Sequence, residues 1–257
     1  MRRGRRPRST AGGLPALLSA ALLLPACAGP ATGTPASAAA PQGGAAIPVQ
    51  LAIRWTRTAA EHRAAFRQTY AWSEARVEAR AADLKPERWA VILDADETVL
   101  DNSAYQLRRA DQGLGYTPES WTAWVMEEAA PALPGAVAFT DRVRTLGGRV
   151  AIVTNRKDHE CDATRRNLEA VGVKADAVLC RTGEGAKDRR FRMVQEGTTP
   201  AGLPPLEVVA WVGDNIGDFP GGTQEAGADE AFLSEFGTRY FVLPNPMYGS
   251  WEDNPVR

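Results

Sequence analysis

The segment Asp94-Ala95-Asp96-Glu97-Thr98 carries the clearest chemistry in this 257-residue chain. It follows the apolar run Trp89–Leu93, which has the length and composition of a buried strand. Side chains two residues apart point to the same side of a strand, so Asp94 and Asp96 are expected to line one pocket where the strand ends. Carboxylates are rarely buried unpaired, so a cation is expected among them. For this segment taken alone, an acidic turn after a strand is the competing interpretation.

Two carboxylates at this spacing suit the transfer of a phosphoryl group. Asp94 can attack phosphorus directly, which requires neither histidine nor serine. Asp96 can protonate the leaving oxygen and then activate water. An acidic pocket would repel an incoming phosphate dianion unless a divalent cation neutralised it, and oxygen-only ligands suit Mg²⁺ best. We therefore predict Mg²⁺ as the cofactor.

The elements that must position these residues alternate between strand and helix. Four further short apolar, β-branched runs follow the first strand, at Arg149–Thr154, Ala177–Cys180, Val208–Gly213 and Arg239–Leu243. Segments with helical character lie between them, such as Ala136–Leu146 and Asp162–Val171. This alternation predicts an α/β fold in which a parallel sheet carries helices on both faces.

A long helical pattern precedes the first strand, from Val49 to about Leu84. Apolar residues recur in it near a 3.6-residue period, at Trp55, Ala59, Phe66, Tyr70 and Val77. His62 and Ser73 share the same stripe, so its apolar character is incomplete. We predict helix over the whole segment.

Parallel sheets bind ligands beyond the carboxyl ends of their strands. Thr154-Asn155-Arg156 ends the second strand, Asp214 and Asp218 follow the fourth, and Lys187 lies between the third and the fourth. Thr154 and Lys187 can hold the phosphate oxygens. Asp94, the backbone carbonyl of Asp96 and Asp214 can hold Mg²⁺. Lys187 taken alone is an ordinary solvated lysine, and it is its place in this ordered set that favours function.

The amino-terminal residues have the parts of a bacterial export signal. Five arginines in the first eight residues precede an apolar stretch from Leu14 to Leu24, which is too short for a permanent membrane span. Leu24-Pro25-Ala26-Cys27 resembles a lipoprotein box, so we predict a signal peptide over 1–26 and lipidation of Cys27. An ordinary signal peptide with an incidental cysteine is the alternative. Residues 27–48 are rich in Ala, Pro, Gly, Ser and Thr and read as a flexible tether.

Charge and length limit what the mature chain can be. Removal of residues 1–26 leaves a net charge of about −6, which argues against nucleic-acid binding through a basic face. Residues 49–257 are enough for one domain with a real core. Cys161 and Cys180 remain in a compartment that permits disulfides, and whether they pair is open.

The ordered motifs resemble the haloacid dehalogenase (HAD) superfamily, and more closely its class C acid phosphatases, the lipoprotein e family of bacterial 5′-nucleotidases. The resemblance covers about residues 49 to 253 and includes Leu100-Asp101-Asn102-Ser103, Val153–Asp158, Gly213-Asp214-Asn215 and Leu243–Glu252. It implies a HAD-like Rossmannoid sheet with a small helical cap, formed by an insertion at about 101–133 together with the N-terminal helical segment.

The resemblance also implies a role for each site residue. Asp94 matches the nucleophile that becomes an aspartyl-phosphate, and Asp96 matches the general acid and base. Thr154 and Lys187 match the phosphate binders. The metal set is Asp94, Asp96, Asp214 and Asp218, with Asp218 supporting the other three. We also assign Asn155 and Arg156 to substrate binding.

Aromatic residues suggest the substrate. The insertion at 101–133 contains Tyr105, Tyr116, Trp121 and Trp124, which is too aromatic for a plain connector. In relatives, residues matching Trp121 and Tyr248 sandwich the base of a nucleoside monophosphate. Stacking of this kind contributes about 1–3 kcal/mol per base and tolerates any base. We interpret Trp124 as a packing residue.

We therefore predict a Mg²⁺-dependent acid phosphatase or 5′-nucleotidase that hydrolyses nucleoside monophosphates and related esters. The predicted location is the bacterial cell envelope, with a lipid anchor in the outer membrane, facing the periplasm or the surface, and a homo-oligomer is left open. One alternative is a non-catalytic surface lipoprotein that binds haem or a protein partner, although no axial haem ligands cluster in the sequence. The other is a phosphotransferase that uses the same site.

Overall fold

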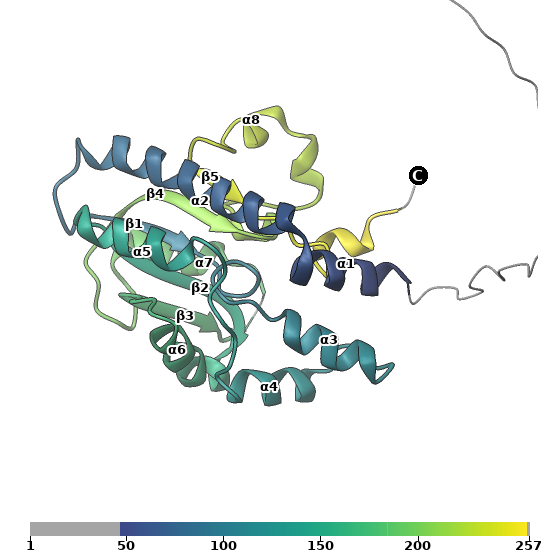
Figure 1. Cartoon of the computed structure of the whole chain (residues 1–257). Helices are drawn as coiled ribbons and strands as arrows, with labels where there is room; N and C mark the ends of the chain where they lie inside the picture. Colours follow the sequence, from purple (N-terminus) through teal and green to yellow (C-terminus); the bar gives the residue numbers. More distant parts are fainter. Residues whose placement is uncertain (1–46, 184, 256–257) are drawn as a thin grey trace, which may run out of the picture. The chain divides into compact units, whose positions relative to one another are not determined.

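The computed structural model describes residues 47–183 and 185–255. Five parallel strands form one sheet in the order β3-β2-β1-β4-β5, with β1 in the middle (Figure 1). The strands are β1 (Trp89–Leu93), β2 (Arg149–Lys157), β3 (Ala177–Arg181), β4 (Glu207–Gly213) and β5 (Tyr240–Val242). This confirms the predicted α/β fold class. The predicted signal peptide, Cys27 and nearly all of the tether lie outside the described residues.

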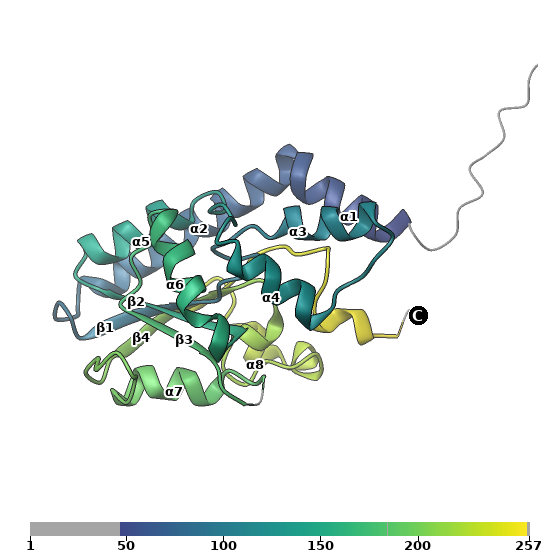
Figure 2. The same ribbon diagram turned by 90° about the horizontal axis from the view of Figure 1, so that it is seen from below.

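Helices cover both faces of the sheet (Figure 2). Every residue of β1 is buried, and its side chains alternate between two apolar clusters. Val91 and Leu93 belong to the cluster beneath α2 (Ala60–Ala81), α5 (Ala136–Thr145) and α6 (Cys161–Ala170). Ala90 and Ile92 belong to the cluster on the opposite face, beneath α7 (Asp188–Glu196) and α8 (Glu230–Leu233). The central strand β1 therefore contributes to both cores at once.

Two short helices lie beyond the carboxyl ends of the strands. These are α3 (Ser103–Asp111) and α4 (Pro118–Met126), both within the predicted insertion. Thr117 and Ser120 form a capping box that starts α4, and Pro118 occupies its first turn. The first helix, α1 (Ile47–Thr58), packs against α3. The insertion therefore supplies two helices at this edge of the sheet, and α1 packs on one of them.

The N-terminal helical pattern is two helices and not one, which corrects the prediction. Ala59 has extended backbone angles, φ −75° and ψ 133°, between α1 and α2. The two helices bury different surfaces, since α1 packs on α3 of the cap while α2 packs on α5 and the sheet. One straight helix could not reach both. Trp55 of α1 and His62 of α2 meet edge to face across the break, with ring centroids 5.3 Å apart.

Cys161 and Cys180 form a disulfide, which answers the question that the sequence left open. The bond ties the first residue of α6 to β3, so it links two segments at the carboxyl edge of the sheet. None of the helices in the described part of the chain is long and apolar enough to cross a membrane.

Candidate active site

Asp94 lies directly after β1, at the carboxyl edge of the sheet. Its backbone N–H donates to Val212 O at 2.9 Å, which continues the pairing of β1 with β4 by one residue. Its side chain is buried, and one carboxylate oxygen accepts a hydrogen bond from Lys187 Nζ. Lys187 is only 3% exposed, so it is not the solvated lysine of the competing interpretation.

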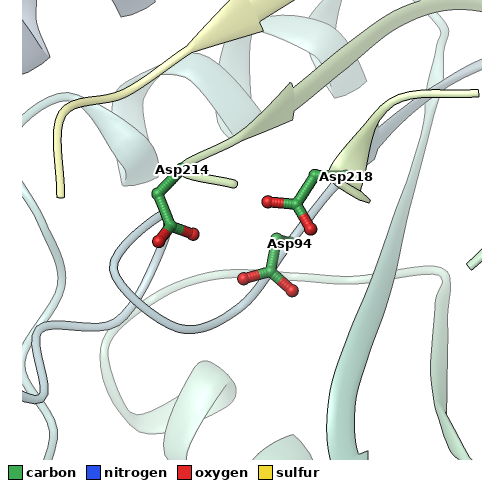
Figure 3. Close-up of side chains that lie close together, drawn as sticks. All are labelled: Asp94, Asp214 and Asp218. Atoms are coloured by element: carbon green, nitrogen blue, oxygen red, sulfur yellow. The ribbon is translucent and has the colours of Figure 1, made fainter. Parts of the chain in front are cut away.

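Three carboxylates converge at this point. Asp94, Asp214 and Asp218 each offer an oxygen, and these oxygens all lie within 4.8 Å of one another (Figure 3). Asp214 directly follows β4, and its oxygens accept hydrogen bonds from Thr98 Oγ1 at 3.2 Å and from Asn245 Nδ2 at 2.8 Å. The sheet order, which sets β1 next to β4, brings Asp94 and Asp214 together.

Asp218 is held by a tight turn after β4. It lies in the 3₁₀ turn η2 (Ile216–Asp218), where its Oδ2 accepts from Asn215 N at 2.9 Å. Its Oδ1 forms an ion pair with Lys187 Nζ at 2.7 Å. A Cβ on Gly213 would lie 2.3 Å from the Cβ of Asp218, so this position must lack a side chain for the turn to form.

The electrostatics of the cluster are unfavourable without a further cation. Burial raises the pKa of Asp94 to about 7, against the opposing effect of Lys187 and with the help of the Asp218 and Asp96 charges. Burial and the Asp218 and Asp94 charges likewise raise the pKa of Asp214 well above its usual range. Lys187 contacts Asp94 and Asp218 but is the one cation to do so among the described residues. One ammonium group cannot balance three carboxylates, of which Asp94 and Asp218 are buried and Asp214 is half-buried.

The cluster fits a divalent metal ion. Its donors are all carboxylate oxygens, which hard cations such as Mg²⁺ prefer. Two of the three groups, Asp94 and Asp214, have raised pKa values, and a nearby cation would stabilise their ionised forms. The carboxylate of Asp96 is outside the cluster, which leaves its backbone carbonyl as the group available to a metal.

The Asp96 carboxylate turns toward β2 instead. Its Oδ1 accepts hydrogen bonds from Arg156 Nε at 2.9 Å and from Asn102 Nδ2 at 2.9 Å, and it forms an ion pair with Arg156 Nη2 at 2.8 Å. Arg156 was assigned to substrate binding, but its guanidinium is buried and is occupied by Asp96, Asn102 and Thr164. In this structure Arg156 therefore contacts the acid beside the nucleophile.

Thr154 and Asn155 lie near the end of β2. The Thr154 hydroxyl accepts from Arg156 N at 3.1 Å, which leaves its own proton free to donate. Asn155 is exposed, and its Oδ1 accepts from Arg190 Nη2 at 2.6 Å. The buried Arg190 also donates to Thr154 O and to Gly185 O, so it ties the end of β2 to the loop that carries Lys187.

Trp121 and Tyr248 approach the site from different parts of the chain. Trp121 of α4 is half-buried, packs edge to face on Tyr105 at 5.2 Å between centroids, and has the Arg156 guanidinium 5.7 Å above its ring. Tyr248 lies after β5 and donates its hydroxyl proton to Glu97. Trp124 is buried, as a packing residue would be.

A family model for HAD superfamily, subfamily IIIB (acid phosphatase), matches residues 37–251. The chain belongs to this family. The class C acid phosphatase of Bacillus anthracis has the same fold, with a TM-score of 0.71 and 32% identity over 79% of this chain and 86% of that one. The same enzyme with tungstate bound gives a TM-score of 0.70 and 32% identity over 81% and 89%.

Curated plant proteins are also relatives of this chain. The chain is 29% identical to acid phosphatase 1 of Solanum lycopersicum over 183 residues, which are 66% of this chain and 63% of that protein. It spans less than two thirds of the length of the curated relatives that it matches.

Sequence reasoning assigned no role to four polar residues around the acid phosphatase carboxylates. Glu97 and Asn102 support Asp96, while Thr98 and Asn245 hold Asp214. Glu97 and Thr98 lie within the first acidic segment, so their position was a signal for at least a local role. Asn102 and Asn245 lie in segments that carry the family resemblance, but the sequence gives no indication that Asn245 contacts Asp214.

Proposed function

We propose that this chain is a Mg²⁺-dependent phosphomonoester hydrolase of the cell envelope that acts on nucleoside monophosphates through an aspartyl-phosphate. The observation that carries the proposal is the buried contact of Asp94 with Lys187 beside Asp214 and Asp218, with the Asp96 carboxylate held two residues away. Membership of the acid phosphatase family supports the same chemistry.

In the first step, a carboxylate oxygen of Asp94 attacks phosphorus and the bond from phosphorus to the ester oxygen breaks. Asp96 gives its proton to that leaving oxygen, and the alcohol departs. In the second step, Asp96 takes a proton from water, the water oxygen attacks phosphorus, and the bond to Asp94 breaks. Inorganic phosphate leaves, and both carboxyl groups return to their starting states.

Two side chains hold the transferring phosphoryl oxygens. Lys187 has three N–H donors, of which Asp94 and Asp218 use two, so one is available to the phosphate. The Thr154 hydroxyl proton is the other donor, since its oxygen already accepts from Arg156 N. Donors fixed in this way stabilise the charge that develops in the transition state. The tungstate-bound relative supports an oxyanion site of this kind.

Asp94, Asp214, Asp218 and the Asp96 carbonyl are the groups that would hold Mg²⁺. The ion would supply positive charge against the phosphate dianion and would keep Asp94 ionised at neutral pH. The raised pKa values of Asp94 and Asp214 are the physical support for this assignment.

Trp121 and Tyr248 favour a substrate with a flat ring system. Both side chains are linked to the Asp96 carboxylate by intermediate contacts. Trp121 lies against Arg156, which pairs with Asp96. Tyr248 donates to Glu97, which accepts from Asn102, and Asn102 also donates to Asp96. We expect Trp121→Ala to raise KM for nucleoside monophosphates by about 10-fold or more, because stacking contributes about 1–3 kcal/mol. KM for glycerol 2-phosphate, which has no base, should not change. Equal effects on both esters would contradict the stacking role.

The mechanism is tested with Asp94→Asn, a nearly isosteric change. We expect it to abolish hydrolysis of p-nitrophenyl phosphate while the circular dichroism spectrum stays that of the wild type. EDTA should silence the wild type, and added Mg²⁺ should restore it. Retained turnover in Asp94→Asn would contradict the assignment of Asp94 as the nucleophile. Full activity in EDTA would contradict the dependence on a metal ion. Assays with added nucleoside separate hydrolysis from transfer to an alcohol.

The envelope location rests on the amino-terminal sequence alone. We expect the full chain to fractionate with membranes in a bacterial host, and Cys27→Ala to release it or to leave it unlipidated. A Cys27→Ala protein that carries lipid and stays with the membrane to the same extent would contradict the anchor.

A further inference from the structure

Asn102 lies between the catalytic acid and two other parts of the molecule. It is fully buried at the start of α3. Its Nδ2 donates to Asp96 Oδ1 at 2.9 Å and to Glu97 Oε2 at 3.2 Å. Its Oδ1 accepts from Trp124 Nε1 at 2.8 Å and from Arg156 Nη2 at 3.3 Å. One side chain therefore contacts the acid, the cap helix α4 and strand β2.

The chemistry around Asn102 allows only one orientation of its amide. Two carboxylates face the nitrogen, and two N–H donors face the oxygen. A flipped amide would set its oxygen against both carboxylates and its N–H₂ group against both donors. The direction in which Asn102 presents a proton to Asp96 is thus fixed by four neighbours.

Glu97 fixes Asn102 in turn. It is 3% exposed, and its Oε1 accepts from Asn102 N at 2.8 Å while its Oε2 accepts from Asn102 Nδ2 and from the Tyr248 hydroxyl. Its φ of +50° is a left-handed conformation that residues other than glycine rarely adopt. A local backbone cost is tolerated here because the side chain meets both N–H groups of Asn102 and the C-terminal segment.

The donors reach only one oxygen of Asp96. Arg156 and Asn102 both donate to Oδ1, and none of the described side chains donates to Oδ2. A carboxylate held by one oxygen in this way presents the other to a substrate. The geometry points to Asn102 as a positioning residue that, with Glu97 behind it, aims Asp96 Oδ2 at the leaving oxygen of the ester. This inference rests on the proposed function, in which Asp96 is the general acid.

The test uses the dependence of the rate on the leaving group. A misaligned general acid slows esters whose alcohols leave poorly and hardly affects those that leave without a proton. The second-order constant kcat/KM reports only the steps up to release of the alcohol, so the later work of Asp96 on water does not obscure it. We would compare glycerol 2-phosphate, a poor leaving group, with 2,4-dinitrophenyl phosphate, a good one, using the full chain with Mg²⁺.

We expect Asn102→Ala to lower kcat/KM for glycerol 2-phosphate by about 100-fold, within the range of general acid catalysis, and for the dinitrophenyl ester by less than about 5-fold. Asn167→Ala is the matched control. Asn167 is also a buried asparagine. Its Oδ1 accepts from Ala130 N and its Nδ2 donates to Ala130 O, and neither group contacts Asp96. Its loss should change both constants by the same factor.

Equal losses on the two esters in Asn102→Ala would mean a merely structural role and would overturn the inference. If that variant does not fold, Glu97→Gln tests the same inference. It keeps the size of the side chain but places an amide N–H₂ group against the Asn102 and Tyr248 donors that Glu97 now accepts from. It should show the same selective loss at smaller size, and equal losses would again overturn the inference. A wild type that hydrolyses neither ester would overturn the proposed function, and this inference with it.

Discussion

The Cys161–Cys180 disulfide gives a stability prediction whose size follows from the chain itself. The two residues are 19 positions apart in sequence, so the bond closes a short loop that contains α6 and the connection from α6 into β3. Closing a loop of this length removes about 3 kcal/mol of conformational freedom from the unfolded chain. Both cysteines are buried, and alanine has no polar side-chain atom, so the replacement leaves no unpaired polar group. We expect Cys161→Ala/Cys180→Ala to lower the free energy of unfolding by about 3 kcal/mol.

Urea denaturation followed by circular dichroism measures this change directly. For a domain of about this size, 1 kcal/mol corresponds to about 2–4 °C in Tm, so the melting temperature should fall by about 6–12 °C. Reduction of the wild type should reproduce the effect. Hydrolysis by the folded double variant should persist at 25 °C, because Arg190 holds the loop that carries Lys187 through its own hydrogen bonds. A loss of stability below about 1 kcal/mol, in either the variant or the reduced wild type, would refute the loop-closure reasoning.

Three further predictions concern the carboxylate cluster. Gly213→Ala should displace Asp218, because the new Cβ would lie 2.3 Å from the Cβ of Asp218. The Mg²⁺ concentration needed for half-maximal activity should then rise at least about 10-fold. An unchanged Mg²⁺ titration would contradict this prediction. Lys187→Met should destabilise the metal-free protein at pH 7.5 by about 3–5 kcal/mol, since it removes the cation from two buried carboxylates, and Mg²⁺ should restore part of the loss in thermal melts. Because burial raises the pKa of Asp94 from 3.8 to about 7 in the folded state, this carboxyl lowers stability progressively as the pH rises from about 4 to about 7, and the full loss is present above that pH. In EDTA, Asp94→Asn should therefore gain melting temperature over the wild type at pH 7.5, with a smaller gain at pH 5, and a gain independent of pH would rule this out.

The sequence was enough to predict the sheet and the residues at its carboxyl edge. Buried parallel strands are short apolar runs, and Asp94, Thr154 and Asp214 each follow or end such a run. Once the strands are parallel, their carboxyl ends lie on one edge of the sheet, so the candidate residues are placed on that edge whatever the strand order. The break at Ala59 escaped this reasoning because the apolar period continues through it, while the packing of α1 on the cap decides it.

Residue type and local period fix the elements and where they end, so the set of groups at the site follows from the sequence. Which of these groups are in contact depends on the packing of the folded chain. It buries Lys187 between Asp94 and Asp218, turns Arg156 toward Asp96, pairs the two cysteines and joins Glu97 to Tyr248. The contacts of Lys187 with Asp94, of Arg156 with Asp96, of the two cysteines and of Glu97 with Tyr248 join residues that are 93, 60, 19 and 151 positions apart, respectively. Contacts at such separations depend on how the layers pack, which no local pattern of residues records.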